Sequence, residues 1–231
     1  MRETFEKLTT GLLALAAVVI AVTLVHREFF ATPPAAPSSA VVPVFRDDWQ
    51  EFARVGVRSD TGVAKVQIVE FADFECPFCA TYEPTLQKAE ERYRGAVSRV
   101  FVHYPLEIHR FAKPAARAAE CAAELGAFAA MRDALYAKQD SFGLRPWQAY
   151  ARDAGIKDLA SFQRCNDNSE IPARVQQGAD LALKLKIRGT PTLVINGWEY
   201  AGGPPDSVLY KAIDSLMVGK NPPGAVGKGD R

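Results

Sequence analysis

Residues 69–79 read VEFADFECPFC. Their first six residues are the end of the run Lys65–Phe74, whose β-branched and aromatic residues predict a buried central strand. The strand stops before Cys76-Pro77, and proline is favoured in the first turn of a helix. Apolar residues then recur at helical spacing from Cys79 to Arg94. The chain is therefore expected to pass from a buried strand directly into a helix that begins with two cysteines.

The residues after this helix predict a mixed α/β fold. Val97–Tyr104 alternates and reads as a second strand, and a right-handed helical crossover would make the two strands parallel. Residues of about 110–187 are rich in helical patterns, and Asn196-Gly197 is a strong hairpin signal between two short strands. Asp206–Met217 reads as a closing amphipathic helix. This order predicts a βαβ unit and a ββα unit with an inserted α-helical domain between them.

The N-terminal part of the 231-residue chain has a different character. Residues 8–27 contain an uncharged apolar run long enough for a membrane-spanning helix, although a cleaved signal sequence is the alternative. Residues 1–7 are then expected to be cytoplasmic, and the Pro/Ala-rich residues 28–46 to form a linker. The folded domain is predicted at 47–218, with a disordered tail at 219–231.

The charge of the chain argues against one class of partner. The formal net charge is +1, and no block of like charges would form a basic stripe on a helix or strand. Nucleic-acid binding is therefore not expected. If the apolar N-terminal segment directs export, the folded domain works in an oxidising compartment where disulfides persist.

Cys76 and Cys79 are spaced so that their thiols can face one another at a helix start. The partial positive charge of the helix N-terminus favours a thiolate at Cys76, which lowers the pKa of that thiol and makes it the nucleophile. Cys79 lies inside the first turn and suits the resolving thiol of a redox-active disulfide. Two other readings are half of a zinc site and a structural disulfide. No second ligand pair at zinc spacing is visible, so neither a metal nor a cofactor is expected.

Two further positions have both a plain and a functional interpretation. Glu70 stands in an otherwise apolar strand; it either faces outward or is a buried carboxylate with a raised pKa that exchanges protons with Cys79. The loop Gly189-Thr190-Pro191-Thr192 precedes a strand, and its proline either simply starts that strand or forms a cis peptide bond. A cis bond would leave the backbone of Thr190 free to pair with an extended substrate chain.

The remaining cysteines, Cys121 and Cys165, lie on separate predicted helices of the insertion. In an oxidising compartment the plain reading is a structural disulfide between two helices. Two free buried thiols or a second redox centre are the alternatives, and the second lacks an activating local sequence.

At these residues the chain resembles the DsbA-like family of thioredoxin-fold disulfide oxidoreductases, over roughly Trp49–Met217. The likeness rests on residues 69–79, the helical block and the loop 189–192. It implies a cis bond at Pro191, with Thr190 contacting substrate. It also implies that Cys76 is the exposed nucleophile, that Cys79 is the buried thiol, and that Glu70 is the family's buried acid.

One residue departs from the best known oxidases of the family, which have histidine where this chain has Phe78. Phenylalanine has no donor to hold a thiolate, so the reduced form should be less stabilised and the potential should lie below the most oxidising members, within the wide range of about −120 to −270 mV. Phe78 is instead expected to contribute apolar surface for substrate. The direction of exchange is left open by this departure.

The resulting expectation is a protein disulfide oxidoreductase anchored in a bacterial cell envelope, with its domain outside the cytoplasm. Its partners would be cysteine-containing exported polypeptides and a membrane redox partner, either a quinone-linked oxidase or a thiol reductant. An oxidase is the first reading. A reductase or isomerase, and a redox-inactive chaperone-like binding module, are the alternatives.

Overall fold

The computed structural model describes Val19 and residues 42–58 and 64–225. The chain divides into a unit that ends at Ala40 and a unit from Val41 to Arg231. Of the first unit only Val19 is described, so the predicted anchor at 8–27 and most of the predicted linker lie outside the described residues. Among the residues that are described, no helix is long and apolar enough to cross a membrane.

The sheet of the second unit is built around β3 (Val66–Ala72), which is almost entirely buried. β3 pairs in parallel with β4 (Val97–His103) and antiparallel with β5 (Thr192–Ile195). β5 continues into β6 (Trp198–Ala201) through the predicted hairpin, in which Asn196 and Gly197 have φ of 45° and 94°. Both values suit the tight turn that joins twisted strands. The parallel pairing of the first two strands and the hairpin are therefore confirmed.

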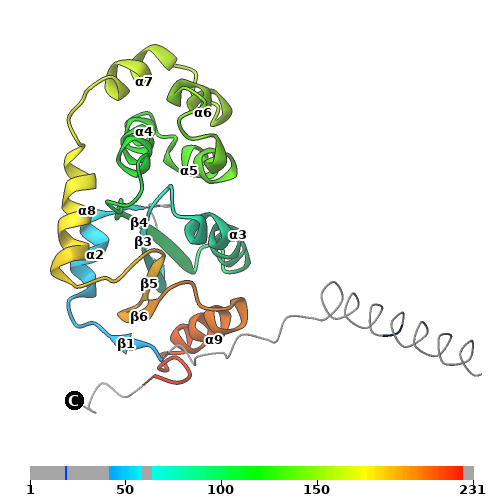
Figure 1. The fold of residues 1–231 in the computed structure, drawn as a ribbon. Coiled ribbons are helices and arrows are strands. Elements are labelled where there is room, and N and C mark those ends of the chain that lie inside the picture. The colour runs from blue at the N-terminus through cyan, green and yellow to red at the C-terminus, as the bar shows by residue number, and fades with distance from the viewer. Residues whose placement is uncertain (1–18, 20–41, 59–63, 226–231) are drawn as a thin grey trace, which may run out of the picture. The chain divides into compact units, whose positions relative to one another are not determined.

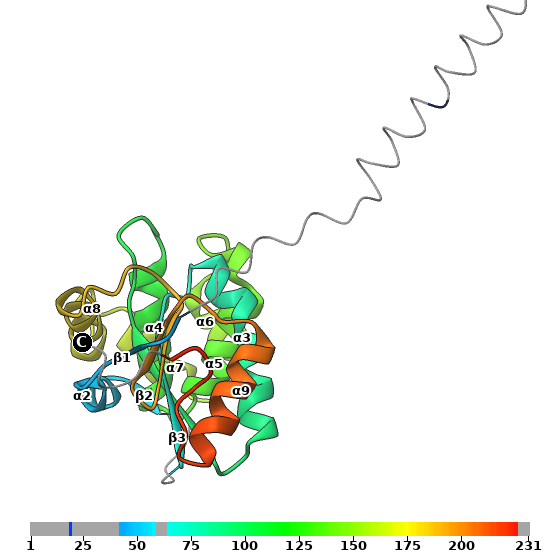
Figure 2. The same cartoon turned by 90° about the horizontal axis from the view of Figure 1, so that it is seen from below.

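Helices cover both faces of this sheet (Figures 1 and 2). α3 (Pro77–Arg92) and α9 (Asp206–Met217) lie on one face, where their apolar residues join those of alternate strand positions in one buried cluster. α2 (Trp49–Val55) and α8 (Ala173–Lys184) lie on the other face and bury the remaining alternate positions. Because side chains alternate along a strand, β3 can supply both clusters.

The predicted helical insertion is present between β4 and β5, and Figure 1 shows most of it stacked beyond one end of the sheet. Its members are α4 (Ala112–Glu124), α5 (Phe128–Ala137), the short 3-10 helix η1 (Gln139–Ser141), α6 (Trp147–Asp153) and α7 (Leu159–Asn166). The last helix of the predicted insertion, α8, instead covers the sheet. The insertion and the cysteine-bearing end of α3 share one buried cluster.

The boundaries of the folded unit are wider than the sequence predicted. β1 (Val44–Phe45), within the predicted linker, pairs with β6, and β2 (Val57–Arg58) pairs with β4, so the order is β1-β6-β5-β3-β4-β2. α2 was also missed. Two-residue edge strands carry too little pattern to be read from sequence. At the other end, Ala225 packs against the α3–α9 cluster, so the tail predicted to be disordered from 219 is ordered as far as it is described.

Candidate active site

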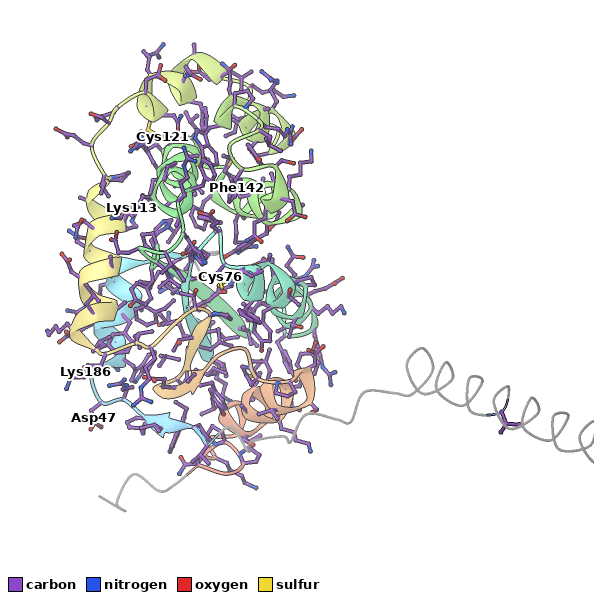
Figure 3. The ribbon with its side chains drawn as sticks, in the orientation of Figure 1. Asp47, Cys76, Lys113, Cys121, Phe142 and Lys186 are labelled. Carbon is purple, nitrogen blue, oxygen red and sulfur yellow. A yellow bond between two sulfur atoms is a disulfide. The ribbon has the colours of Figure 1, made fainter. Side chains whose placement is uncertain are left out.

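The two cysteines of the motif lie where β3 passes into α3. Cys76 is the N-cap residue of α3, Pro77 is its first residue, and Cys79 lies in the first turn. The carbonyl of Cys76 accepts from the backbone N–H groups of Cys79, at 3.1 Å, and Ala80, at 3.2 Å. Both thiols are free, and Figure 3 shows Cys76 at the start of α3 between the sheet and the insertion. The predicted helix start is confirmed.

Cys76 has the properties of a nucleophilic thiol. A hydrogen bond from the Cys79 thiol, opposed by burial and assisted by Thr190 and by backbone N–H groups of the first turn, lowers the pKa of Cys76 to about 6. A thiolate at that position is therefore the major form near neutral pH. The exposure that the family resemblance implies for Cys76 is wrong for this structure, in which both thiols are free, because Cys76 is only 3% exposed.

Cys79 is the more deeply buried of the two thiols and has no exposed surface. Burial raises its pKa far above the ordinary range, and the thiol of Cys76 and the carboxyl group of Glu70 raise it further. The two sulfurs are thus strongly asymmetric. The surroundings of Cys76 favour a thiolate, whereas those of Cys79 favour a protonated thiol.

The loop before β5 contacts this pair of thiols. The Thr190–Pro191 peptide bond is cis, as predicted. The Cys76 Sγ donates to the backbone carbonyl of Thr190 at 3.3 Å. The Thr190 hydroxyl is buried without a hydrogen-bond partner among the described residues, and it helps to lower the pKa of Cys76. The loop and the start of α3 therefore come together from positions 114 residues apart in the chain.

Glu70 is fully buried on the α3 side of β3, which confirms the buried of its two predicted placements, while proton exchange with Cys79 stays a prediction. Burial raises the pKa of Glu70, although the guanidinium of Arg99 opposes the rise. Arg99 Nε donates to Glu70 at 2.9 Å, and its other nitrogens bind Glu83 at 2.5 and 2.9 Å. Arg132 of α5 reaches Glu83 as well, at 3.0 Å.

Sequence reasoning missed Arg99, Glu83 and Arg132. The available signals were weak but present. Arg99 interrupts the alternating strand Val97–His103, and Glu83 lies one helical turn after Cys79, so Glu83 shares a helix face with Cys79. Buried charges persist where they are paired. Here the ion pairs link β3, β4 and α5 to α3, the helix that begins at the two cysteines.

A second group of missed residues holds the turn that leads into Cys76. Asp73 is 2% exposed; its carboxylate accepts from the backbone of Glu75 at 2.7 Å and of Leu106 at 2.8 Å, and lies 2.7 Å from His109 Nδ1. Gln139 of η1 donates to the carbonyls of Phe74, at 2.7 Å, and Cys76, at 3.0 Å. These bonds connect the insertion and the β4–α4 loop to the motif.

Large apolar side chains are exposed around the same turn. Phe78 is 72% exposed, as expected for a substrate-facing residue. Ile108 and Leu144, at 85% and 83%, were not singled out by the sequence. Glu75 accepts from the backbone N–H of Phe111, whose ring lies against Gly143, so the segments that carry Ile108 and Leu144 meet beside the turn.

The other cysteines form a separate feature. Cys121 of α4 and Cys165 of α7 are joined by a disulfide, with Cα atoms 5.7 Å apart, which confirms the predicted pairing. Figure 3 shows Cys121 inside the insertion, away from Cys76. In the part of the chain that the structure describes, no group of three or more His, Cys, Asp or Glu side chains is arranged to hold a metal ion.

Comparison with known proteins agrees with this architecture. A family model described as Thioredoxin matches residues 61–215. A probable disulfide bond formation protein D from Bacillus anthracis is 30% identical over 178 residues, which cover 67% of this chain and 75% of that protein. A solved thioredoxin-like oxidoreductase from Silicibacter pomeroyi is 27% identical, with a TM-score of 0.62 over 73% of this chain and 96% of that one.

Other curated relatives are much longer proteins. A Na(+)/H(+) antiporter NhaA 3 from Salinispora tropica is 39% identical over 156 residues, which are 67% of this chain but 24% of the antiporter. The chain thus spans about a quarter of the length of the antiporters that it matches. With the matched family, the cysteine pair at the start of α3 and the cis proline opposite it, the chain belongs to the thioredoxin family, in its DsbA-like branch.

Proposed function

We propose that this protein is a thiol–disulfide oxidoreductase that exchanges disulfides with cysteines of exported polypeptides through Cys76 and Cys79. The observation that carries the proposal is the asymmetry of the two sulfurs at one helix start. The pKa of Cys76 is lowered to about 6, whereas burial raises that of Cys79 far above its ordinary range. This difference in pKa determines which sulfur of the disulfide a substrate thiolate attacks and which sulfur leaves.

In the oxidase direction, a substrate thiolate attacks the Cys76 Sγ of the oxidised pair. A bond forms between the substrate sulfur and Cys76 while the Cys76–Cys79 bond breaks, and Cys79 leaves with the electron pair and takes up a proton. A second substrate thiolate then attacks the substrate sulfur of the mixed disulfide. Cys76 leaves as a stabilised thiolate, so the substrate gains a disulfide and the enzyme keeps two electrons.

The substrate segment crosses the apolar surface around the motif. Thr190, beside the cis Pro191, offers backbone groups to an extended chain on one side of Cys76. Phe78, Ile108 and Leu144 offer exposed apolar area around the same turn. A partly folded exported polypeptide with apolar residues near its cysteine fits this surface, because such residues are still accessible before folding is complete.

We assign the oxidase direction first. The low pKa of Cys76 stabilises the reduced enzyme, and a stabilised reduced form makes a dithiol pair oxidising. Phe78 supplies no donor to that thiolate, so the pair is a milder oxidant than a histidine-bearing one. A reductase or isomerase is the alternative, and it would depend on a thiol reductant rather than on a quinone-linked oxidase in the membrane.

The site of action follows from the same chemistry. A disulfide-forming enzyme is useful where disulfides persist, so the domain is assigned to the extracytoplasmic side of a bacterial envelope, held there by the apolar segment 8–27. The Cys121–Cys165 disulfide supports an oxidising compartment. A membrane redox partner would then renew the Cys76–Cys79 disulfide after each turnover.

One experiment separates this function from a redox-inactive, chaperone-like binding module. The double variant Cys76→Ser, Cys79→Ser should lose all disulfide formation on a reduced test protein, while it still slows aggregation of that protein to the extent that the apolar surface binds it. Exchange that survives the double substitution would overturn the enzymatic proposal. The equilibrium potential of the pair in glutathione buffers then decides direction: a value near −270 mV, as in thioredoxin, would exclude the oxidase role.

A further inference from the structure

Gln139 is a residue of the helical insertion that binds the backbone of Cys76. Its side-chain amide donates to the carbonyl of Phe74 at 2.7 Å and to that of Cys76 at 3.0 Å. An amide NH2 group has two donors and carbonyl oxygens only accept, so both donors are used at this one turn. Gln139 therefore binds both ends of the segment 74–76 from a position more than 60 residues later in the chain.

The carbonyl of Cys76 does not need this bond to be satisfied. It already accepts from the N–H groups of Cys79, at 3.1 Å, and Ala80, at 3.2 Å, in the first turn of α3. A carbonyl oxygen has two lone pairs, and these two donors are enough to occupy them. What Gln139 adds at Cys76 is an attachment of the insertion to the active-site turn.

The residues that follow Gln139 present one of the exposed apolar side chains of the site. The carbonyl of Gln139 accepts from the N–H of Phe142 at 3.0 Å, and that of Ser141 accepts from Leu144 at 3.0 Å. Phe142 is 8% exposed and packs against Trp147, with ring centroids 5.3 Å apart, whereas Leu144 is 83% exposed. Successive tight turns leave little freedom between them, so the place of Leu144 follows from that of Gln139.

A second contact attaches the same segment to the same turn. The ring of Phe111 lies against Gly143, so close that a Cβ atom there would be 2.4 Å from the ring. The backbone N–H of Phe111 donates in turn to the carboxylate of Glu75. Residues 74–76 thus contact the segment 139–143 directly through Gln139 and indirectly through Phe111.

We propose that Gln139 is a positioning residue that holds Leu144 beside Cys76, so that a polypeptide meets the sulfur and the apolar surface together. This inference rests on the proposed function and deepens it. A small dithiol needs only the sulfur, whereas a polypeptide with apolar residues near its cysteine uses both. Gln139 therefore governs the binding of polypeptide substrates and leaves the exchange step itself unchanged.

The test is Gln139→Met, which keeps the length of the side chain and removes both donors. The oxidised chain reacts in single turnovers with dithiothreitol or with a reduced synthetic peptide that has two cysteines and flanking leucines. The half-saturating peptide concentration should rise about tenfold, because only the fraction of molecules with Leu144 in place binds the peptide well. The limiting rate with the peptide and the rate with dithiothreitol should stay within about twofold of the wild-type values, since the exchange step is unchanged.

Leu144→Ala tests the route by which Gln139 acts. This change should itself raise the half-saturating peptide concentration. In the Leu144→Ala background, Gln139→Met should then add less than about a twofold further rise, because the residue through which Gln139 acts is already gone. Two effects that simply multiply would show that Gln139 acts elsewhere, and would overturn the inference.

Gln87→Met is the matched control. Gln87, in the middle of α3, also bonds to the insertion, through Asp133 of α5 at 3.0 Å, but it does not touch the active-site turn. This variant should match the wild type with both thiol substrates. An equal rise for the peptide in both glutamine variants would mean a general loosening of the insertion, and the inference would fail.

The remaining outcomes separate the inference from the proposed function. An unchanged half-saturating concentration in Gln139→Met, or an equal slowing with dithiothreitol, would overturn the inference while disulfide exchange stands. If Gln139→Met does not fold, Gln139→Asn, whose shorter amide cannot reach both carbonyls, should show the same peptide-specific loss. If the oxidised wild-type chain oxidises neither thiol substrate, the proposed function itself fails, and that result is read on the wild type alone.

Discussion

The hydroxyl of Thr190 should set part of the thiol acidity of Cys76. The side chain is buried, and it assists the Cys79 thiol and the helix N–H groups in lowering the pKa of Cys76 to about 6, from an ordinary value of 9.0. The substitution Thr190→Val keeps the branched shape but replaces the hydroxyl by a methyl group. It leaves the backbone carbonyl that accepts from Cys76 in place.

The size of the effect can be worked from the hydrogen bond that the unpartnered Thr190 hydroxyl can donate once Cys76 is ionised. A hydrogen bond to a charged group contributes about 1.5–3 kcal/mol, and about 1.4 kcal/mol corresponds to one pH unit of pKa. Taking the low end of this range, the pKa of Cys76 should rise by about one pH unit. At pH 7 this removes about 1 kcal/mol of thiolate stabilisation from the reduced form, which lowers the potential by about 20 mV.

The sign of the pH dependence follows from the same shift. Folding lowers the pKa of Cys76, so the stabilisation of the reduced form is fully present above the ordinary value of 9.0 and is lost as the pH falls through about 6. In Thr190→Val this loss should occur at higher pH. Absorbance of the thiolate at 240 nm against pH measures the pKa directly, and glutathione equilibria measure the potential.

Thr190→Ser is the matched control, because it keeps a hydroxyl at the same place and should leave the pKa of Cys76 close to the wild-type value. An unchanged or lowered pKa in Thr190→Val would refute the reasoning. It would show that the helix N-terminus and the Cys79 thiol alone account for the acidity.

Three further outcomes are expected. Phe78→His should raise the potential by on the order of 20 mV, because an imidazole can donate to the thiolate, and an unchanged or lower value in glutathione buffers would contradict this. Replacing Cys121 and Cys165 by alanine should lower the free energy of unfolding by about 4 kcal/mol for a separation of 44 residues; an equal urea midpoint would show that the disulfide is not a constraint. Arg99→Met should destabilise by about 3–5 kcal/mol, because Glu70 and its neighbouring acid lose their buried partner, and a stable variant in urea unfolding would mean that the acids are neutral.

Local patterns were sufficient for much of the fold. The strand before the motif, the helix start at Pro77, the parallel second strand and the Asn196-Gly197 hairpin each depend on a few adjacent residues, and all four are confirmed. The edge strands and α2 were missed because two-residue strands and a seven-residue helix leave almost no periodic signal. Such short elements owe their existence to the sheet and helices that they pack against.

The candidate site divides in the same way. Cys76 and Cys79 lie within one helical turn, so spacing alone was enough to predict them as the candidate redox pair. Arg99 could not be assigned from spacing, because its ion pairs depend on burial beside Glu70, which belongs to another strand. Burial changes the free energy of a charge, and only packing determines what is buried.

The sequence by itself thus predicted the cysteine pair, the helix that begins at it, and the cis proline loop that lies against it. These depend on covalent order and local backbone preference. Only the tertiary structure decided that Cys76 is covered rather than exposed, that Glu70 shares a buried arginine with a second acid, and that the insertion reaches the active-site turn. The reason is physical: the acidity of a thiol and the pairing of a buried charge are set by neighbours in space, and those neighbours are distant in the chain.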